Sequence, residues 1–173
     1  MDKIFFAKVK ENAIIPSKER ENAGYDFYAC FDEDFIEIKP HETKLIPTGI
    51  AWASSEEYYL QIEERSSTGS KGIKKSAGVI DSGYRGEILI AINNANDKTL
   101  FISKLTEEEL STTYPQVIHN VIHKNYIIYP YSKAIAQGIV HRVLDLEVKE
   151  LTYDELLGIK SNRGTGGFGS SNK

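Results

Sequence analysis

Cysteine is nearly absent from this chain, since Cys30 is the only one among 173 residues. A lone cysteine cannot form a disulfide within its own chain, so the fold must be stable without one, and a reduced, cytoplasmic setting is expected. Long apolar runs are absent as well. The stretch Ile4-Phe5-Phe6 is too short for a signal peptide, and no segment approaches the roughly 20 apolar residues of a membrane span. We therefore expect no contact with a membrane.

A strong excess of either charge is also missing. The chain has 21 Lys and Arg against 25 Asp and Glu, which gives a formal net charge of -4. This balance argues against direct nucleic-acid binding through a basic surface, but it leaves room for a local pocket that binds a small polyanion. With 173 residues, 40% of them hydrophobic, the chain is most simply one domain around one core.

Apolar residues recur with a period of two. The short runs that show it are rich in β-branched or aromatic residues, and they are 36–39, 59–63, 87–92 and 138–143. This pattern predicts a mainly antiparallel β fold, either a sandwich or a barrel. Capping-box sequences that begin at Thr106 and Thr152 predict two short helices, the second ended by Gly158. Neither helix is long enough to organise a domain.

The segment 163–171 near the C-terminus combines one cation and one aromatic ring with four glycines. So many glycines make a segment costly to order, and as plain structure it would fray like most termini. A planar, anionic ligand would change that balance, because Phe168 can stack on a base while Arg163 and the backbone N–H groups around Gly166 meet phosphate oxygens. The tail therefore indicates a lid over such a ligand, with a frayed terminus as the alternative.

Three further clusters offer the groups that such a ligand needs. The segment 65–69, Arg-Ser-Ser-Thr-Gly, presents a guanidinium and successive hydroxyls that suit a phosphate, although an ordinary solvated loop can begin the same way. The segment 78–86 presents the carboxylate of Asp81, which is either a functional group or a simple turn aspartate. The segment 23–29 places Asp26 among aromatic residues, where its charge needs a partner such as a hydrated cation.

The order of these clusters and their residue sequences resemble the five motifs of the homotrimeric dUTPase family (deoxyuridine 5'-triphosphate nucleotidohydrolase). The matching segments span nearly the whole chain, and they are 23–29, 65–69, 78–86, 134–137 and 163–171. The resemblance implies a jelly-roll or distorted β-barrel fold with one or two short helices, and a homotrimer whose active sites are shared between subunits. It also implies Mg²⁺-assisted hydrolysis of dUTP to dUMP and pyrophosphate, which keeps uracil out of DNA and supplies dUMP for dTMP synthesis.

By this resemblance, Asp81 is the general base that activates water for attack at the α-phosphorus. Tyr84 would lie under the deoxyribose and leave no room for a 2'-hydroxyl, so UTP is expected to be rejected. The hairpin backbone at Gly78, Val79 and Ile80 would read the uracil edge in a pocket too tight for the thymine methyl group. Cytosine would present a donor where uracil presents an acceptor, which leaves buried amide groups mispaired.

The resemblance assigns further substrate-binding roles to Arg65, Ser66, Ser67, Gln137, Arg163, Phe168 and Gly169. The first three would hold phosphates, and Gln137 would help to fix the chain. Asp26 would act on the Mg²⁺ ion through its waters, because Mg²⁺ keeps several waters when phosphate oxygens supply its other ligands. The tail would close as a lid from a neighbouring subunit, with Phe168 over the uracil and Arg163 on the γ-phosphate side.

Some positions depart from the family pattern. Glu64 stands where the family usually has Pro, Gly83 replaces a frequent acidic residue, and 132–134 replaces a common turn before Gln137. The segment 96–131 is longer than the usual connection between the third and fourth motifs. An exposed insertion or an extra β-arm is expected there, and longer forms of this kind suggest a phage or Gram-positive source.

Two histidines of this segment, His119 and His123, have the spacing to share a metal on a helix, but no Cys or carboxylate at matching spacing accompanies them. The expected organisation is a β domain over 1–160, including the insertion at about 96–131, followed by a flexible lid over 161–173.

Two alternatives to a dUTPase remain open. One is a dCTP deaminase-like enzyme of the same superfamily, although the tail fits a dUTPase better. The other is a regulatory module that binds a protein partner through the insertion at 96–131, which need not exclude catalysis. The set of Asp81, Tyr84, Arg65 and Phe168 favours a working hydrolase.

Overall fold

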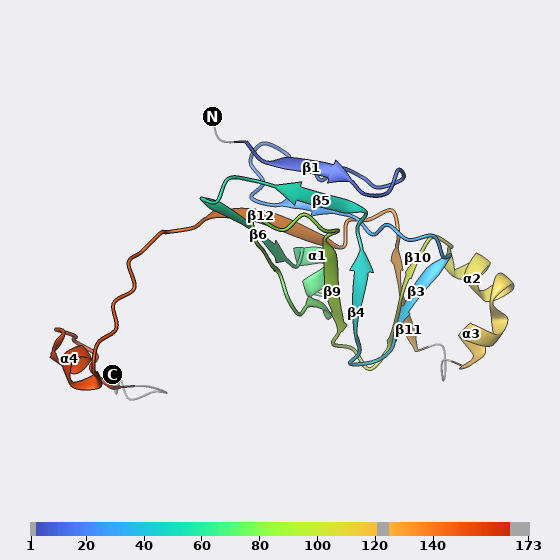
Figure 1. Cartoon of the computed structure of the whole chain (residues 1–173). Coiled ribbons are helices and arrows are strands. Elements are labelled where there is room, and N and C mark those ends of the chain that lie inside the picture. The colour runs from blue at the N-terminus through green and yellow to red at the C-terminus, as the bar shows by residue number, and fades with distance from the viewer. Residues whose placement is uncertain (1–2, 121–124, 167–173) are drawn as a thin grey trace. The chain divides into compact units, whose positions relative to one another are not determined.

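A computed structural model gives the fold and describes residues 3–120 and 125–166 (Figure 1). By its internal contacts the chain divides into two compact units, Met1–Val143 and Leu144–Lys173. The described strands all belong to the first unit, whereas the second unit holds α4 (Tyr153–Gly158). The expected boundary after residue 160 stays a prediction, and the contacts divide the chain before α4.

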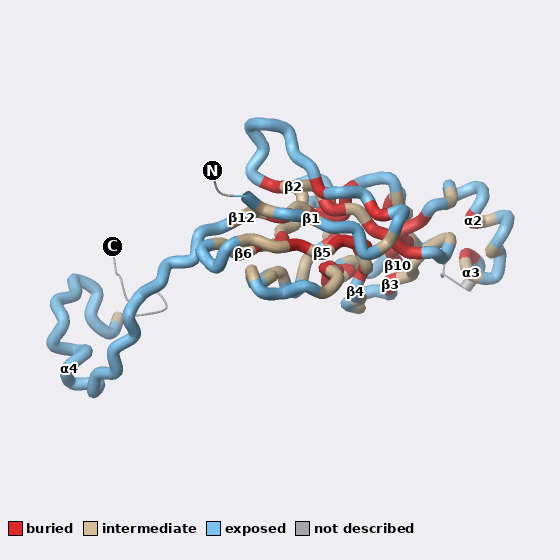
Figure 2. The backbone as a smooth tube through the Cα atoms, turned by 45° about the horizontal axis from the view of Figure 1, so that its top comes forward, coloured by how far each residue is buried: buried red, intermediate tan, exposed pale blue. Residues whose placement is uncertain are grey.

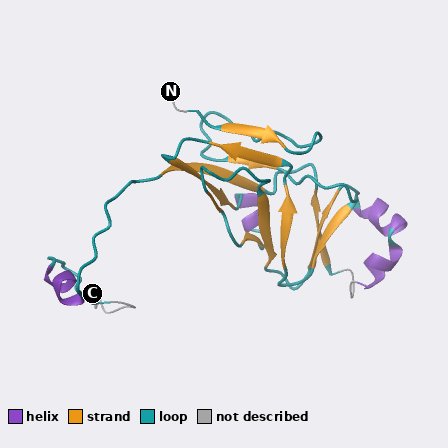
Figure 3. Ribbon diagram, viewed as in Figure 1, coloured by secondary structure: helices purple, strands orange, loops and turns teal. Residues whose placement is uncertain are grey.

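The described strands of the first unit form four small sheets (Figure 3). In order across each sheet, they are β1 (Phe5–Lys8) and β5 (Ile50–Ala53); β2 (Tyr25–Phe27), β12 (Ala136–Arg142), β6 (Tyr58–Glu63) and β8 (Val79–Ile80); β4 (Thr43–Pro47), β9 (Leu89–Asn94) and β7 (Ile73–Lys75); and β11 (Tyr126–Pro130), β10 (Thr99–Ser103) and β3 (Phe35–Ile38). The pairings between these strands are antiparallel except that β10 runs parallel to β11. The mainly antiparallel β fold predicted from the alternating pattern is confirmed.

The alternating runs lie where the sequence places them, because β3, β6, β9 and β12 overlap the four predicted segments. In β6, Leu60 and Ile62 are buried whereas Gln61 between them is half-exposed, as expected for a strand with one face on the core. The buried residues gather in the strands of the first unit (Figure 2). The largest fully buried side chains include Trp52 and Phe27.

Both predicted helices are present. α2 (Glu107–Thr113) begins after Thr106, whose hydroxyl accepts the Glu109 N–H at 3.3 Å while the Glu109 carboxylate accepts the Thr106 N–H at 2.8 Å. These hydrogen bonds lower the pKa of the Glu109 carboxyl, and the bond from the Thr106 backbone has the largest effect. The same arrangement starts α4 at Thr152. Two other helices, α1 (Ser66–Gly69) and α3 (Pro115–Asn120), were not predicted.

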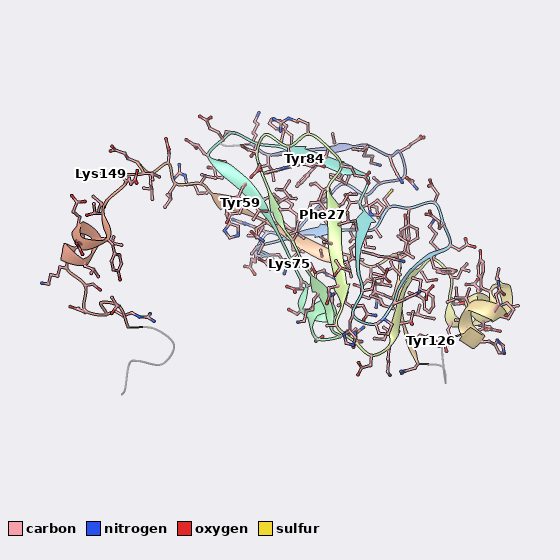
Figure 4. All side chains as sticks on the ribbon, turned by 60° about the horizontal axis from the view of Figure 1, so that its bottom comes forward. Phe27, Tyr59, Lys75, Tyr84, Tyr126 and Lys149 are labelled. Atoms are coloured by element: carbon pink, nitrogen blue, oxygen red, sulfur yellow. The ribbon has the colours of Figure 1, made fainter. Side chains whose placement is uncertain are left out.

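The expectation of an exposed insertion over 96–131 is wrong for β10, in which all five residues are buried. The run Leu100-Phe101-Ile102 is apolar on both faces of the strand, and β10 lies between β3 and β11, so it is part of the core. The segment is also not a β-arm, because α2 and α3 connect the parallel strands β10 and β11. Leu110 and Ile118 pack these helices on Phe101, next to Tyr126 (Figure 4).

In the second unit, large apolar side chains are exposed at alternate positions before α4. Leu144 and Leu146 are each 72% exposed and Val148 is 93% exposed. A period of two is typical of a strand with one buried face, yet the structure assigns no strand to these residues. In the described part of the chain, no helix has the length and apolar content needed to cross a membrane.

Candidate active site

A polar cavity of about 480 Å³ lies in the first unit, where β2, β12 and the start of α1 come together. Its lining comes from three of the five sequence clusters and the loop before β2, and consists of Glu21, Asn22, Ala23, Gly24, Asp26, Arg65, Ser66, Ser67 and Gln137. The register explains this meeting, because Gln137 of β12 lies opposite both Asp26 of β2 and Glu63 of β6. Arg65 follows β6 directly, so the strand delivers it to the same end of the sheet.

The guanidinium of Arg65 holds the carboxylate of Asp26 with two contacts. Arg65 Nε lies 2.9 Å from Asp26 Oδ1, and Arg65 Nη2 donates to Asp26 Oδ2 at 3.3 Å. Both side chains are about one-third exposed, at 32% and 33%, so water still reaches the pair. The partner that the charge of Asp26 requires is therefore Arg65, and the fork geometry fixes the plane of the guanidinium at the cavity wall.

Two buried groups behind the cavity position Arg65. The hydroxyl of Thr68, only 1% exposed, accepts the Arg65 N–H at 3.1 Å and donates to the Arg65 carbonyl at 2.9 Å. Arg65 Nη1 donates to the carbonyl of Ala134 at 3.4 Å, and that carbonyl also accepts the hydroxyl of Tyr129 at 2.6 Å. Burial raises the pKa of Tyr129, although the charge of Arg65 lowers it in part, so the phenol remains a neutral donor at neutral pH.

Gln137 closes the cavity from β12. Its Nε2 donates to the carbonyl of Glu64 at 2.8 Å, which ties the end of β6 to β12. A Cβ on Gly24 would lie 2.6 Å from Gln137 Oε1 and 2.9 Å from Gln137 Cβ. Any larger residue at position 24 would therefore collide with the Gln137 side chain, and glycine avoids this collision. The carboxylate of Glu64, where the family usually has Pro, accepts the Lys75 N–H at 3.3 Å and so supports β7.

The cavity suits a phosphate chain. It offers one guanidinium, the hydroxyls of two exposed serines and the amide of Gln137. Phosphate oxygens accept hydrogen bonds from donors of these kinds. The described residues contain no group of three or more His, Cys, Asp or Glu side chains that could hold a metal by themselves. A Mg²⁺ ion held mostly by phosphate oxygens and waters, with Asp26 beside it, fits this donor set.

The third cluster forms a hairpin on β8. Gly78 accepts the Ile62 N–H at 2.8 Å, and a Cβ on Gly78 would lie 2.6 Å from the Ile62 carbonyl, so a side chain here would displace backbone. Val79 and Ile80 pair with β6, and Val79 is 63% exposed. Asp81 follows as an exposed residue at the start of the turn. The hairpin therefore presents its backbone edge and the Asp81 carboxylate outward.

Tyr84 belongs to the same turn, and the sticks in Figure 4 show it at the surface. Its N–H donates to the Asp81 carbonyl at 3.1 Å, and its hydroxyl donates to the Glu87 carbonyl at 2.9 Å. A Cβ on Gly86 would collide with the Tyr84 hydroxyl, so the ring lies over this glycine. The ring is 45% exposed and held at both ends, which leaves it available as a rigid surface for a ligand.

One chain does not bring Asp81 to the cavity. Ile80 pairs with Leu60, so Asp81 lies at the level of Tyr59 near the start of β6, whereas Arg65 lies beyond the other end of the strand. At about 3.3 Å per residue, the six steps from Tyr59 to Arg65 span roughly 20 Å. The predicted site is therefore divided within one chain. Asp81, Tyr84 and the hairpin form one part of it, and the Arg65 cavity forms the other part.

Only part of the fifth cluster is described. Arg163 is exposed, and its Nε donates to the carbonyl of Gly166 at 2.7 Å, with Gly164 at a φ of 55° between them. Phe168 and Gly169 lie outside the described residues. So does His123, and the structure does not test the argument against a metal shared with His119. His119 Nδ1 lies 2.6 Å from the Pro115 carbonyl.

Sequence reasoning missed several groups that support the site, among them Thr68, Tyr129, Trp52 and the Ala134 carbonyl. Thr68 had a local signal, because a threonine three residues after a helix start can bond back to it. Tyr129 donates to the Ala134 carbonyl five residues later, and Trp52 donates to the Asp81 carbonyl 29 residues later. Such contacts follow from the fold and leave no motif.

Comparison with known proteins gives a family. A family model described as dUTPase matches residues 10–106. The deoxyuridine 5'-triphosphate nucleotidohydrolase of Nautilia profundicola is 32% identical over 175 residues, which cover 99% of this chain and 99% of the relative. The protein of the same name from Leptospira interrogans is 38% identical over 104 residues, 58% of this chain and 71% of the relative.

Solved structures agree with the fold. A mutant dUTPase of Staphylococcus bacteriophage 80alpha, determined with dUpNHpp, has a TM-score of 0.73 and 23% identity, covering 98% of both chains. A mutant dUTPase of phage phi11 of S. aureus, for which a structural Mg(II) ion is described, has a TM-score of 0.65 and 21% identity, covering 86% of this chain and 96% of that one. Since the family model spans more than half of the chain and the Nautilia relative nearly all of it, this chain belongs to the dUTPase family and has its jelly-roll-like β fold.

Proposed function

We propose that this chain hydrolyses dUTP to dUMP and pyrophosphate. The observation that carries the proposal is the cavity in which Arg65, Ser66, Ser67 and Gln137 meet beside Asp26, in a member of the dUTPase family. A triphosphate needs several charge-assisted donors, and the cavity volume of about 480 Å³ accommodates a small polyanion with its waters. The reaction removes a DNA precursor that carries uracil and yields dUMP.

In this proposal the cavity binds the phosphates. The Arg65 guanidinium donates to phosphate oxygens from its exposed edge, because its other edge is occupied by Asp26. Ser66 and Ser67 add hydroxyl donors, and Gln137 fixes the wall opposite them. Asp26 holds the waters of a Mg²⁺ ion, which supplies positive charge at the phosphate oxygens when it is bound.

Asp81 is the proposed base. Its carboxylate is exposed on the hairpin turn, and it accepts a proton from the water that attacks the α-phosphorus. The side chain of an ordinary aspartate is a weak base, so its effect depends on exact placement next to that water.

The hairpin selects the nucleoside. The backbone of Gly78, Val79 and Ile80 meets the uracil edge, and the backbone pairing of this segment with β6 keeps that edge rigid. The ring of Tyr84 supports the deoxyribose and excludes a 2'-hydroxyl, because its hydroxyl is bonded to Glu87 and the ring has no room to retreat over Gly86.

A homotrimer with shared sites is part of the proposal. The roughly 20 Å between Asp81 and Arg65 along β6 is too long for both to act on one phosphorus, so the base and the cavity of a working site come from different chains. The exposed alternate apolar residues Leu144, Leu146 and Val148 support contact between copies as well.

The tail is the proposed lid. Arg163 meets the γ-phosphate side, Phe168 stacks on the uracil, and Gly169 lies beside the substrate. Arg163 is exposed, and its side chain donates from Nε to the nearby Gly166 carbonyl, a bond that a phosphate can replace. The domain limits, the cytoplasmic location and a protein partner for the region of 96–131 stay predictions.

The first experiment measures pyrophosphate release with Mg²⁺ from dUTP, dCTP, dTTP and UTP in parallel. We expect turnover of dUTP with a kcat/KM at least 10³-fold above that for each of the others, because mispaired buried amides give large discrimination. Equal turnover of dCTP and dUTP, or release of ammonia from dCTP, would favour the deaminase-like alternative. Binding of dUTP without turnover would favour a regulatory module.

A further inference from the structure

Trp52 is the single tryptophan of the chain, and it lies behind the hairpin that carries Asp81. It belongs to β5, where it pairs with Phe6 of β1, and it is only 2% exposed. Its indole Nε1 donates to the backbone carbonyl of Asp81 at 3.2 Å. A buried indole N–H needs an acceptor, and this one is the carbonyl of the residue proposed as the base.

The rest of the turn is tied to the same strand. The Asp81 carbonyl also accepts the Tyr84 N–H at 3.1 Å, so it closes the turn and receives Trp52 at once. The backbone carbonyl of Glu87 accepts a hydrogen bond from the Tyr84 hydroxyl. The carboxylate of Glu87 accepts a hydrogen bond from the Gly49 N–H at 2.7 Å. The two ends of the turn are therefore fixed to Trp52 of β5 and to Gly49, the residue before β5, while the Asp81 side chain remains exposed.

We propose that Trp52 is a positioning residue for Asp81, and this rests on the proposed function. The indole N–H fixes the Asp81 carbonyl and, through the rigid peptide units of the turn, the direction of the Asp81 carboxylate. Without that bond, the turn keeps its closure by Tyr84 and the contact of Glu87 with Gly49, but its Asp81 end loses its attachment to β5. A displacement of about 1 Å in a reacting group can reduce a rate by roughly 10²-fold, so the anchor acts on turnover more than on binding.

The test is Trp52→Phe, which keeps a buried aromatic ring and removes the donor. We expect kcat for dUTP to fall by about tenfold with KM changed less than about twofold, since the phosphate cavity is elsewhere and the bonds that hold the hairpin on β6 and Tyr84 on Glu87 do not involve Trp52. Phe101→Leu is the matched control. It removes buried aromatic packing in the cluster under α2 and α3, remote from the hairpin, and is expected to reduce stability without changing kcat.

A double substitution separates positioning from general damage. If Trp52 acts through Asp81, then Trp52→Phe in an Asp81→Asn background lowers the residual kcat by less than about twofold, because residues that act as a unit are not additive. A full tenfold loss in that background, or a loss of kcat in Phe101→Leu equal to that in Trp52→Phe, would overturn the proposal.

A second measurement does not depend on turnover. Because Trp52 is the sole tryptophan, one indole N–H resonance reports on this bond in the proton spectrum of the whole protein. We expect slow exchange of this proton with solvent, and a shift of the resonance when dUpNHpp binds. A rapidly exchanging indole N–H overturns the anchor even if dUTP is hydrolysed, whereas slow exchange without any dUTP turnover leaves the anchor and rejects the proposed function.

Discussion

Asp81→Asn is expected to lower kcat for dUTP by about 10³-fold, within the range that a positioned general base contributes. Asparagine keeps the size of the side chain but cannot take a proton from water. The two bonds that fix the turn, from Trp52 and from the Tyr84 N–H, end on the Asp81 backbone carbonyl, so the substitution leaves them in place. Pyrophosphate release gives kcat, and calorimetry with dUpNHpp gives the affinity, which we expect to change less than about threefold.

Asp97→Asn is the matched control. Asp97 lies between β9 and β10, and its side chain is 94% exposed beside His41. The same chemical change there should leave kcat and the affinity for dUpNHpp unaltered. If Asp81→Asn retained more than about a tenth of the wild-type kcat, another group would have to serve as the base.

The strands were predictable because their signal is local. Leu60 and Ile62 are buried and their neighbours are not, and this alternation is visible in the sequence of any half-buried strand. The two capping boxes were predictable for the same reason, since the Thr106 and Glu109 side chains bond only within one helical turn. Signals of this kind need no knowledge of what packs on the element.

The role of β10 could not be predicted in that way. Leu100, Phe101 and Ile102 form a continuous apolar run, which fits a buried strand or a buried helix segment equally well. What decides is the pairing with β3 and, in parallel, with β11, and both partners are remote in the sequence. An extra length of chain between two motifs indicated an insertion, but β10 and β11 of this segment belong to a sheet, and α2 and α3 lie outside it.

The site was predictable by residue type and not by arrangement. The family resemblance named Arg65, Asp26 and Gln137 as site residues, and the structure places all three in the lining of one polar cavity. The bidentate pair of Arg65 with Asp26 and the distance between Asp81 and Arg65 follow from the register of β2, β12, β6 and β8, which no single motif encodes.

Arg65→Ala is expected to lower kcat/KM for dUTP by at least about 10²-fold. Hydrogen bonds to charged groups each contribute roughly 1.5–3 kcal/mol, and one guanidinium edge can make two of them to phosphate oxygens. The substitution also removes the partner of Asp26 and the donor to the Ala134 carbonyl, so the cavity wall loosens. Steady-state kinetics and the affinity for dUpNHpp measure the loss.

Arg65→Lys separates charge from geometry. Lysine keeps the positive charge but cannot span both oxygens of Asp26 and a phosphate with one planar fork. We expect a loss in kcat/KM of about tenfold, between wild type and Arg65→Ala. A lysine variant as active as the wild type would show that only charge matters at this position and that the observed fork has no functional role.

Mixing the two inactive variants tests whether one site is built from different chains. An Asp81→Asn subunit keeps the Arg65 cavity, and an Arg65→Ala subunit keeps the base, so a mixed ring contains some sites with both groups intact. For equal amounts and random assembly in a cyclic oligomer, about a quarter of the sites recover, because each of the two contributing chains is intact at the required position half of the time.

Mixing either variant with the Arg65→Ala, Asp81→Asn double variant should restore nothing. Sites built within one chain would give no recovery in any mixture, and the roughly 20 Å between Asp81 and Arg65 along β6 would then have to close by a rearrangement within the subunit.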